Sequence, residues 1–405
     1  MKLQKFTNQD PIYYYNTNEQ VQIPDTYQEK PFRAMWVSNV VNIDLPTVED
    51  IEKYKSKIIK ILDTCEAYQL NTIIFQVRTN NDAFYASKLN PYSRYFTGKE
   101  GKEPPFDVLA WVISQAKKRA IAFHAWCNPY RVSMNGDLSV EGYLDTCDDL
   151  NYAKQHPDHL ILSKTGQIIL NPAKKEVKDF ICSTILELIE NYDVDGIHFD
   201  DYFYPYGGLD ESHGDQEEYQ SQKLSQELTL EDFRRYHVND MIEQCYKTIK
   251  QYDASIQFGI SPFGIWKNKK ENVFGSNTAP GCTESYHALY ADTVQWVKDE
   301  IIDYLVPQIY WEFGHDIAPF ADICRFWVQV CKDSPVDLYI GHGAYRLGTK
   351  GEFLNPLEIV HQVKYANQFD TVKGNVFFTY KHFIDQKDAY PGMQALKKLF
   401  NGEKI

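Results

Sequence analysis

Several signatures that would assign a chemistry at once are missing from the sequence. No CxxC pair occurs among its 8 cysteines, which disfavours zinc ribbons and thioredoxin-like redox motifs. Glycine-rich phosphate loops of the Walker and Rossmann types are absent, and so is a nucleophile elbow. No window is long and apolar enough to span a membrane. We therefore expect neither a nucleotide-dependent enzyme nor a membrane-embedded protein, and we expect no bound cofactor.

Positive charge is also scarce, because 42 Lys and Arg stand against 56 Asp and Glu and leave a net charge of -14. This balance argues against nucleic acid or an anionic membrane as the main partner. The first residues contain no apolar run long enough for a signal peptide. The cysteines occur in apolar contexts, which favours a reducing compartment. We expect a cytoplasmic protein, or an extracytoplasmic one if a signal peptide has been removed.

Aromatic residues, by contrast, are abundant at 15%, with 29 Tyr and 7 Trp. Tyr and Trp offer flat amphipathic surfaces on which sugar rings stack, although most of the Phe are expected to fill the core. With 405 residues and 43% hydrophobic content, the chain can bury a large core. A carbohydrate is the partner that this composition favours, and no obligate protein partner is indicated.

Strand and helix patterns alternate along the chain, which is typical of a parallel sheet with crossover helices. Residues 1–30 have no clear period and are expected to form an extended arm. In residues 31–405 the alternation predicts one α/β domain. This domain is expected to be a (β/α)8 TIM barrel with enlarged loops after the third, fourth and fifth strands. The first of these loops, about 132–172, contains a predicted hairpin at 160–170. The predicted strands are 33–38, 72–77, 121–126, 196–199, 256–261, 304–309, 336–340 and 374–378. The first predicted helix begins at Thr47. The other predicted helices cover 106–119, 173–191, 229–251, 286–300, 317–332, 356–368 and 391–400.

The stretch 195–205, DGIHFDDYFYP, has the strongest functional pattern. A short apolar strand runs directly into Asp200 and Asp201, and TIM barrels place their chemistry at the carboxyl ends of strands. Strand alternation predicts that His198 and Asp200 share a face, whereas Asp201 points away or lies at the lip. The alternative interpretation is an ordinary loop that begins with Asp because its side chain can hydrogen-bond to the nearby backbone.

Glycoside hydrolysis generally uses two carboxyl groups across the scissile bond. Asp200 is the first candidate. Asp201 is predicted to be catalytic or substrate-binding, or else to cap a loop, and Glu312, after the sixth strand, is a possible partner or a solvated loop residue. A carboxyl group beside a second one has a raised pKa, which makes it a usable acid near neutral pH.

Other polar and aromatic residues at the strand ends are expected to line the same barrel mouth and bind substrate. Arg78 and Arg131 could instead pair with site acids, and Asp82 could pair with Arg78. The histidines could be core residues, and each Trp could be a core residue rather than a sugar platform. The predicted substrate-binding residues are Arg78, Asp82, His124, Trp126, Asn128, Tyr130, Arg131, His198, Trp266, Gln308, Tyr310, Trp311, His342 and Tyr345.

Two other functions fit a barrel with such a mouth. A metal-dependent hydrolase could use His124, His198 and His342, but the first strand has no His and the sequence predicts no metal site. A carbohydrate-binding barrel without catalysis is the second alternative, because a fold does not guarantee chemistry.

The strand ends carry ordered stretches that together resemble one family across about 31–383. They are RAMWV at 33–37, NIDLP at 42–46, QVR at 76–78 with DAFY at 82–85, HAWCNPYR at 124–131, LNP at 170–172, the stretch 195–205, GISPFGIW at 259–266 and PQIYW at 307–311. The chain resembles glycoside hydrolase-like family 10 (the DUF187 group) of bacterial (β/α)8-barrel proteins. The resemblance implies a glycosidase, and because a characterised member acts on peptidoglycan glycan strands stripped of stem peptides, it also implies that possible substrate.

Overall fold

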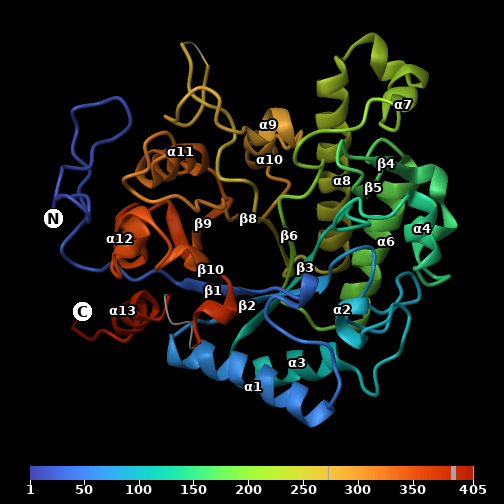
Figure 1. Ribbon diagram of the computed structural model, residues 1–405, viewed down its shortest axis with the longest axis horizontal. Helices are drawn as coiled ribbons and strands as arrows, with labels where there is room; N and C mark the ends of the chain where they lie inside the picture. The colour runs from blue at the N-terminus through green and yellow to red at the C-terminus, as the bar shows by residue number, and fades with distance from the viewer. Residues whose placement is uncertain (272, 385–388, 405) are drawn as a thin grey trace.

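The computed structural model describes residues 1–271, 273–384 and 389–404. In this part of the chain, parallel strands close into a barrel in the order β1-β10-β9-β8-β7-β6-β3-β2 (Figure 1), which confirms the predicted (β/α)8 fold. The barrel strands are β1 Phe32–Val37, β2 Thr72–Arg78, β3 Ala122–Cys127, β6 Gly196–Phe199, β7 Gln257–Ile260, β8 Tyr304–Leu305, β9 Asp337–Gly343 and β10 Val372–Phe378.

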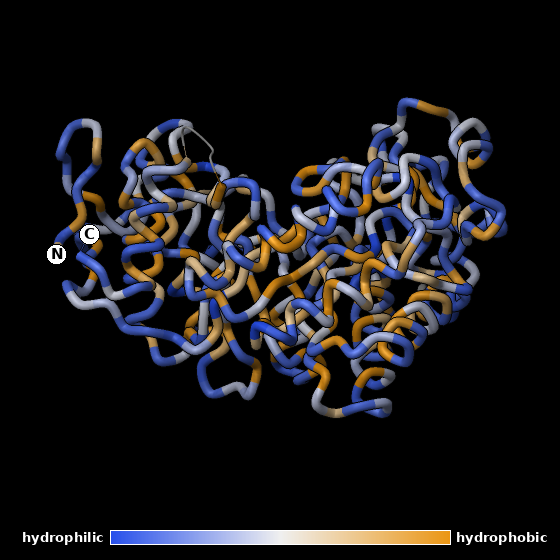
Figure 2. The backbone as a smooth tube through the Cα atoms, turned by 90° about the horizontal axis from the view of Figure 1, so that it is seen from below, coloured by the Kyte–Doolittle hydropathy of each residue, from blue (hydrophilic) through white to orange (hydrophobic). Residues whose placement is uncertain are grey.

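Helices surround the barrel and shield its outer face. Their apolar stripes pack on the strands, and the orange segments in Figure 2 accordingly run through the middle of the molecule. Within the described residues, none of the helices has the length and apolarity needed to cross a bilayer. The covering helices are α1 Ile51–Ala67, α3 Val108–Lys117, α6 Lys175–Asn191, α8 Leu230–Tyr252, α10 Thr293–Lys298, α11 Phe320–Cys331, α12 Glu358–Asn367 and α13 Tyr390–Phe400.

Short helices occupy the loops between these elements. The α-helical ones are α2 Arg94–Thr97, α4 Val140–Asp145, α5 Tyr152–Gln155, α7 Gln216–Ser221 and α9 Ser285–Ala288. The 3-10 turns are η1 Val40–Asn42, η2 Pro157–His159, η3 Lys223–Gln226, η4 Ala344–Arg346, η5 Gly351–Leu354 and η6 Tyr380–His382.

Large side chains fill the barrel interior at its amino-terminal end. Phe32 and Tyr339 stack there with ring centroids 3.9 Å apart. Trp36, Ile74 and Tyr304 pack in the same inner cluster. TIM barrels place their chemistry at the carboxyl ends of the strands, and a cavity forms there in this barrel too.

Three predicted elements differ from the structure. Helix α1 begins at Ile51 and not at Thr47, because the Asp50 carboxylate accepts from Lys53 N at 3.0 Å and caps it. The single helix predicted at 286–300 is broken into α9 and α10, since Tyr290 lies in the left-handed region at φ 51°. The strand predicted at 304–309 stops at Leu305, because Pro307 has no N–H to donate to a ladder.

The loop after β3 carries the predicted hairpin, which the structure confirms. Strands β4 Leu160–Leu162 and β5 Ile168–Leu170 pair in antiparallel register, and Gly166 turns between them at φ 79°. The hairpin also holds the chain that leaves β3, because Leu170 N donates to Tyr130 O at 2.8 Å. In Figure 1 the hairpin lies beside α6 and α8, on the side of the barrel opposite α12.

The amino-terminal segment lies against α11 and α12, as Figure 1 shows. Tyr14 and Tyr365 share a hydrogen bond between their hydroxyl groups at 3.0 Å. Phe6 N donates to the Glu352 carboxylate at 2.7 Å. These contacts fix the segment to the outside of the barrel, away from the barrel mouth.

A single carboxylate ties the first and last strands together at the mouth. Asp44, in the loop after β1, accepts from Ser38 N at 2.7 Å and from Lys381 N at 2.9 Å, and also from the Thr379 hydroxyl. Two of these donors follow β10, so the loop after β1 is held across the seam where the barrel closes.

Replacing Asp44 with Ala is expected to lower the free energy of unfolding by about 2–4 kcal/mol, because several donors lose one charged acceptor. Asp50→Ala, in the same loop, removes only a helix cap and should cost about 1 kcal/mol. Guanidinium denaturation followed by circular dichroism measures both. Equal losses in the two variants would contradict the proposed role of Asp44 in closing the barrel.

Candidate active site

The mouth of the barrel holds a cavity of about 470 Å³. Its walls come from the carboxyl ends of most barrel strands and the loops that follow them. The lining residues are Trp36, Ser38, Val40, Val41, Ile43, Trp126, Arg131, Met134, Asp200, Asp201, Tyr202, Tyr206, Ser261, Phe263, Gln308, Tyr310, Trp311, Tyr345, Arg346 and Phe378.

Asp200 and Asp201 are both buried and both line this cavity, at 3% and 6% exposed. The prediction that Asp201 points away or lies at the lip is therefore wrong. Strand alternation does not apply to it, because β6 ends at Phe199 and the chain turns there. The turn brings two adjacent carboxylates into one apolar pocket.

Asp200 is surrounded by hydrogen-bond donors. Its carboxylate accepts from Trp126 Nε1 at 3.0 Å, from Asn128 Nδ2 at 2.9 and 3.1 Å, and from Tyr202 N at 3.3 Å. Burial raises the pKa of Asp200, while the charge of Arg131 and these donors act in the opposite direction. The donors bind the charged form best, so they limit the rise in the pKa of Asp200 that burial causes.

Asp201 has fewer donors. The Tyr206 hydroxyl donates to its carboxylate. Burial, followed by the neighbouring charge of Asp200, raises the pKa of Asp201 to about 6, although hydrogen bonds from Tyr206 and Gln308 oppose the rise. The two adjacent carboxyls thus differ in their surroundings, because Asp200 has more donors to its charged form and Asp201 has a pKa raised to about 6.

Arg131 lies beside this pair and is 3% exposed. Its Nε donates to Thr79 O at 3.1 Å and to Asn80 Oδ1 at 3.0 Å. The guanidinium carbon lies 4.7 Å from the centre of the Tyr202 ring. Its Nη2 is buried without a hydrogen-bond partner among the described residues.

Several predicted binding residues line the cavity as expected. Trp126, Arg131, Gln308, Tyr310, Trp311 and Tyr345 all do so. Asn128 lies behind Asp200 and bonds to it. Trp266 is instead a core residue, because its Nε1 donates to Asp292 at 3.1 Å and its ring stacks with that of Phe326.

The loop after β2 supports the site from behind and does not enter it. Arg78 is buried and donates to the carbonyls of Asn128 and Pro129, and also to Asn81 Oδ1 at 2.5 Å. Asp82 accepts from Thr79 N at 2.9 Å and does not form the predicted pair with Arg78. These contacts hold the segment from which Asn128 and Arg131 extend.

Tyr130 is a core residue, too. It is 1% exposed and packs in the main hydrophobic cluster between strands and helices. It occurs next to Arg131 in sequence but does not line the cavity, because neighbouring residues of the loop leave β3 in different directions.

The predicted histidines lie below the cavity or outside it, inside the hydrogen-bonded core. His124 and His198 both bond to the Tyr304 hydroxyl, at 2.8 and 3.0 Å. His342 bonds to Asn375 at 2.9 Å and to Gln362 at 3.2 Å. Burial lowers the pKa of each, so all three are neutral near pH 7. The structure does not bring them together as a metal hydrolase would require.

Glu312 is not among the residues that line the cavity. Its carboxylate accepts from Glu352 N at 3.0 Å and lies against Gly351, so it caps the turn η5. The structure therefore brings Asp200 together with Asp201 and not with Glu312.

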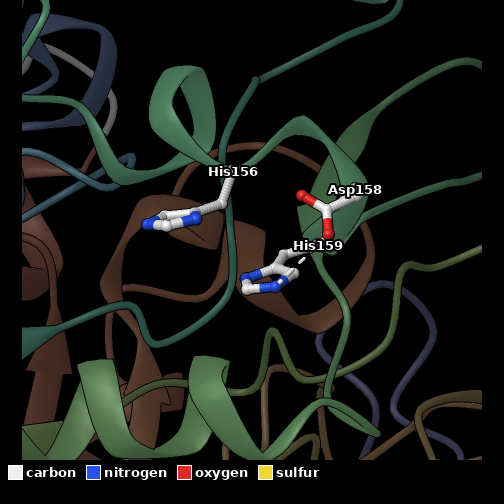
Figure 3. A group of neighbouring side chains, drawn as sticks. All are labelled: His156, Asp158 and His159. Atoms are coloured by element: carbon white, nitrogen blue, oxygen red, sulfur yellow. Dashed lines mark ion pairs between the residues drawn. The ribbon is translucent and has the colours of Figure 1, made fainter.

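In the described part of the chain, a cluster of three side chains in the insertion after β3 could hold a metal ion. His156, Asp158 and His159 offer ligand atoms within 4.8 Å of one another. Figure 3 shows Asp158 turned toward His159, with Nε2 of the ring 3.6 Å from the carboxylate. The two imidazole rings stack with centroids 5.0 Å apart. None of the three lines the cavity, so this cluster is separate from the paired carboxylates.

More than half of the residues in the cavity wall were not predicted from the sequence. Tyr202 and Tyr206 follow the paired acids directly, and the polar character of the stretch 195–205 was a signal for them. Trp36 shares the inward face of β1 with Ala34 and could have been found by alternation. Arg346 follows β9 and Phe378 ends β10, and neither has a distinguishing pattern.

Barrel and cavity together place the protein among the TIM-barrel glycosidases. The model of the glycosyl hydrolase-like 10 family matches residues 31–355. The glycosyl hydrolase YngK of Bacillus subtilis is 37% identical over 357 residues, which are 87% of this chain and 69% of that protein. The glycosyl hydrolase DigH of Escherichia coli K12 is 33% identical over 342 residues, or 80% of this chain and 76% of that protein. The chain belongs to the glycosyl hydrolase-like 10 family.

Solved structures share the fold at low sequence identity. The PgaB (BpsB) glycoside hydrolase domain of Bordetella bronchiseptica has a TM-score of 0.56 at 13% identity, covering 91% of this chain and 99% of that one. The endo-1,4-beta-mannanase of Rhizomucor miehei has a TM-score of 0.53 at 11% identity, covering 96% of this chain and all of that one, 100%. These likenesses concern the barrel architecture.

Replacing Asp201 with Asn should stabilise the protein at neutral pH. The folded pKa of Asp201, about 6, lies above its ordinary value of 3.8. Its contribution to stability is therefore complete below about pH 4 and is lost as the pH rises to 6. Relative to the unsubstituted protein, Asp201→Asn should gain about 2–3 kcal/mol between pH 4 and pH 7.

Urea denaturation at several pH values measures this difference. Asp145→Asn, at an exposed position, is the matched control for the loss of one carboxylate. A stability difference for Asp201→Asn that does not change with pH would show that Asp201 has no raised pKa.

Proposed function

We propose that the protein hydrolyses O-glycosidic bonds of an oligo- or polysaccharide, with Asp201 as the general acid and Asp200 as its ionised partner. The observation that carries this proposal is the pair of buried carboxylates in one aromatic cavity with different hydrogen-bond surroundings. Such a difference is how one site supplies both an acid and a base near neutral pH.

In this mechanism Asp201 gives its proton to the glycosidic oxygen as the bond to the anomeric carbon breaks. The ionised Asp200 stabilises the positive charge that develops on the sugar ring. A water molecule then adds its hydroxyl to the anomeric carbon, and the proton that the water loses returns to Asp201. Trp126 and Asn128 donate to the charged form of Asp200 and so oppose the rise in its pKa that burial causes.

The cavity walls suit a sugar. Tyr310 and Trp311 lie after β8, and Phe378 at the end of β10, so aromatic side chains from both strands line the cavity. Stacked rings bind the C–H faces of sugars, while Gln308 and Arg131 offer donors to hydroxyl oxygens.

Among polysaccharides, peptidoglycan glycan strands stripped of their stem peptides are the first candidate substrate. The support is the resemblance of the strand-end motifs to a family with a characterised member that acts on such strands. A barrel that binds these glycans without cleaving them is the alternative, and the same experiment separates the two.

Asp200→Asn is expected to fold normally and to lose at least about 100-fold in kcat, because the charge that stabilises the transition state is removed. Mass spectrometry of a glycan panel after incubation measures new reducing ends, with peptide-free peptidoglycan strands, chitin oligomers and plant oligosaccharides as substrates. Asp145→Asn serves as the control. Equal product from Asp200→Asn would overturn the assigned role of Asp200.

The pH dependence of cleavage should show the state of Asp201. Because its proton is needed, kcat/KM should fall as the pH rises above about 6, the pKa of Asp201. Tyr206→Phe removes a donor that lowers this pKa, so the alkaline limb should move up by about one pH unit. Tyr236→Phe, at an exposed position, should leave the limb in place. An unmoved limb in Tyr206→Phe would show that another group supplies the proton.

A further inference from the structure

Two cysteine side chains meet between helices α6 and α8. Cys182 Sγ lies 3.6 Å from Cys245 Sγ, although 63 positions separate the two residues in sequence. Cys245 is fully buried, whereas Cys182 is partly buried and stands next to the exposed Ser183. A disulfide bond is about 2.0 Å long, so side-chain rotations that bring the sulfurs together by about 1.5 Å allow the bond to form.

The packing of the two helices fixes the positions of this pair. Lys178 on α6 forms an ion pair with Asp240 on α8, and both side chains have little exposure. Cys182 and Cys245 follow about one turn further along their helices, so the helices run in the same direction along one line of contact. The ion pair therefore sets the register that places the two sulfurs side by side.

The two thiols differ in acidity. The hydrogen bond from Cys245 lowers the pKa of the Cys182 thiol, while burial acts in the opposite direction. The same hydrogen bond, together with burial, raises the pKa of the Cys245 thiol. The partly exposed Cys182 is thus the thiol that becomes a thiolate more readily, and the thiolate is the form that attacks a disulfide.

The surroundings of Cys245 suit a disulfide as well as a thiol. Besides Cys182, its Sγ contacts the thioether sulfur of Met241 at 3.7 Å. A thiol is only a weak hydrogen-bond donor, so joining the two sulfurs removes no strong hydrogen bond from the interior. The packing between α6 and α8 therefore accepts either redox state of the pair.

We propose that Cys182 and Cys245 form a reversible disulfide bond by exchange with a small-molecule disulfide. The Cys182 thiolate attacks one sulfur of that molecule, which releases one small thiol and leaves a mixed disulfide on Cys182. Cys245 then loses its proton and attacks the Cys182 sulfur, which releases the second small thiol. The two protein thiols are oxidised to one disulfide, and the small disulfide is reduced to two thiols.

The bond closes a loop of chain that contains the centre of the candidate active site. Strand β6 and the paired acids, Asp200 and Asp201, lie between the two cysteines in sequence. Because the cross-link restricts the unfolded chain, it raises thermal stability. The pair stays as two thiols in a reducing compartment and closes in an oxidising one. This proposal does not depend on the proposed hydrolysis.

The test incubates the folded protein with oxidised glutathione, blocks the remaining thiols, and maps the peptides by mass spectrometry without reduction. A linked pair of peptides that contain Cys182 and Cys245 is expected. The melting temperature should rise by about 5 °C on oxidation, and dithiothreitol should reverse the change. Absence of the linked peptides, or a stable glutathione adduct on Cys182 in their place, would overturn the proposal.

Three variants test the order of the two steps. Cys245→Ala should stop the exchange after the first step and keep glutathione on Cys182, with no rise in melting temperature. Cys182→Ala should leave the buried Cys245 unmodified. Cys282→Ala is the matched control, because Cys282 is also partly buried but its Sγ lies 3.7 Å from Ile317 O, and it should form the cross-link. A rise in melting temperature that persists in Cys245→Ala would contradict the assignment of the stabilisation to this pair.

Discussion

The pairing of the first barrel strand with the last is the constraint on which the rest of the molecule depends. Strands β1 and β10 run parallel from Phe32 and Gly374 onward. A side chain at position 374 would lie 2.1 Å from Phe32 O, so closure needs a glycine there. Once the sheet is closed, every strand ends on one ring, and residues as distant in sequence as Trp36 and Phe378 share one cavity. Without this pairing the strand ends would spread along an open edge.

The cavity removes two adjacent carboxylates from water, which destabilises the folded protein. Hydrogen bonds from the protein replace the lost hydration more fully for one carboxylate than for the other. Asp200 receives side-chain donors from Trp126 and Asn128, which belong to the neighbouring strand β3 and the loop after it. Asp201 receives less support and keeps its proton to higher pH. The stability that the protein gives up at this point is what makes the two groups chemically different.

The fold and the centre of the site could be predicted from the sequence, but much of the wall could not. Asp200, Trp126 and Gln308 follow strands directly, and strand alternation or position settles where they lie. Beyond the last residue of a strand the alternation stops, so sequence could not show that Trp266 packs in the core or that Glu312 caps a turn. Those outcomes depend on contacts between loops that are distant in sequence.

The hairpin that follows β3 has a consequence for how this family can diversify. Leu170 N donates to Tyr130 O, and Ile169 forms a bridge with Arg131, so the position of that arginine depends on a small sheet outside the barrel. The backbone of the paired acids follows β6, but Asp200 also accepts from Asn128, which lies on the same segment as Arg131. Mutations that reshape the hairpin can therefore move the cation in the cavity and, through Asn128, change the surroundings of Asp200. Recognition and chemistry are linked through the segment that leaves β3.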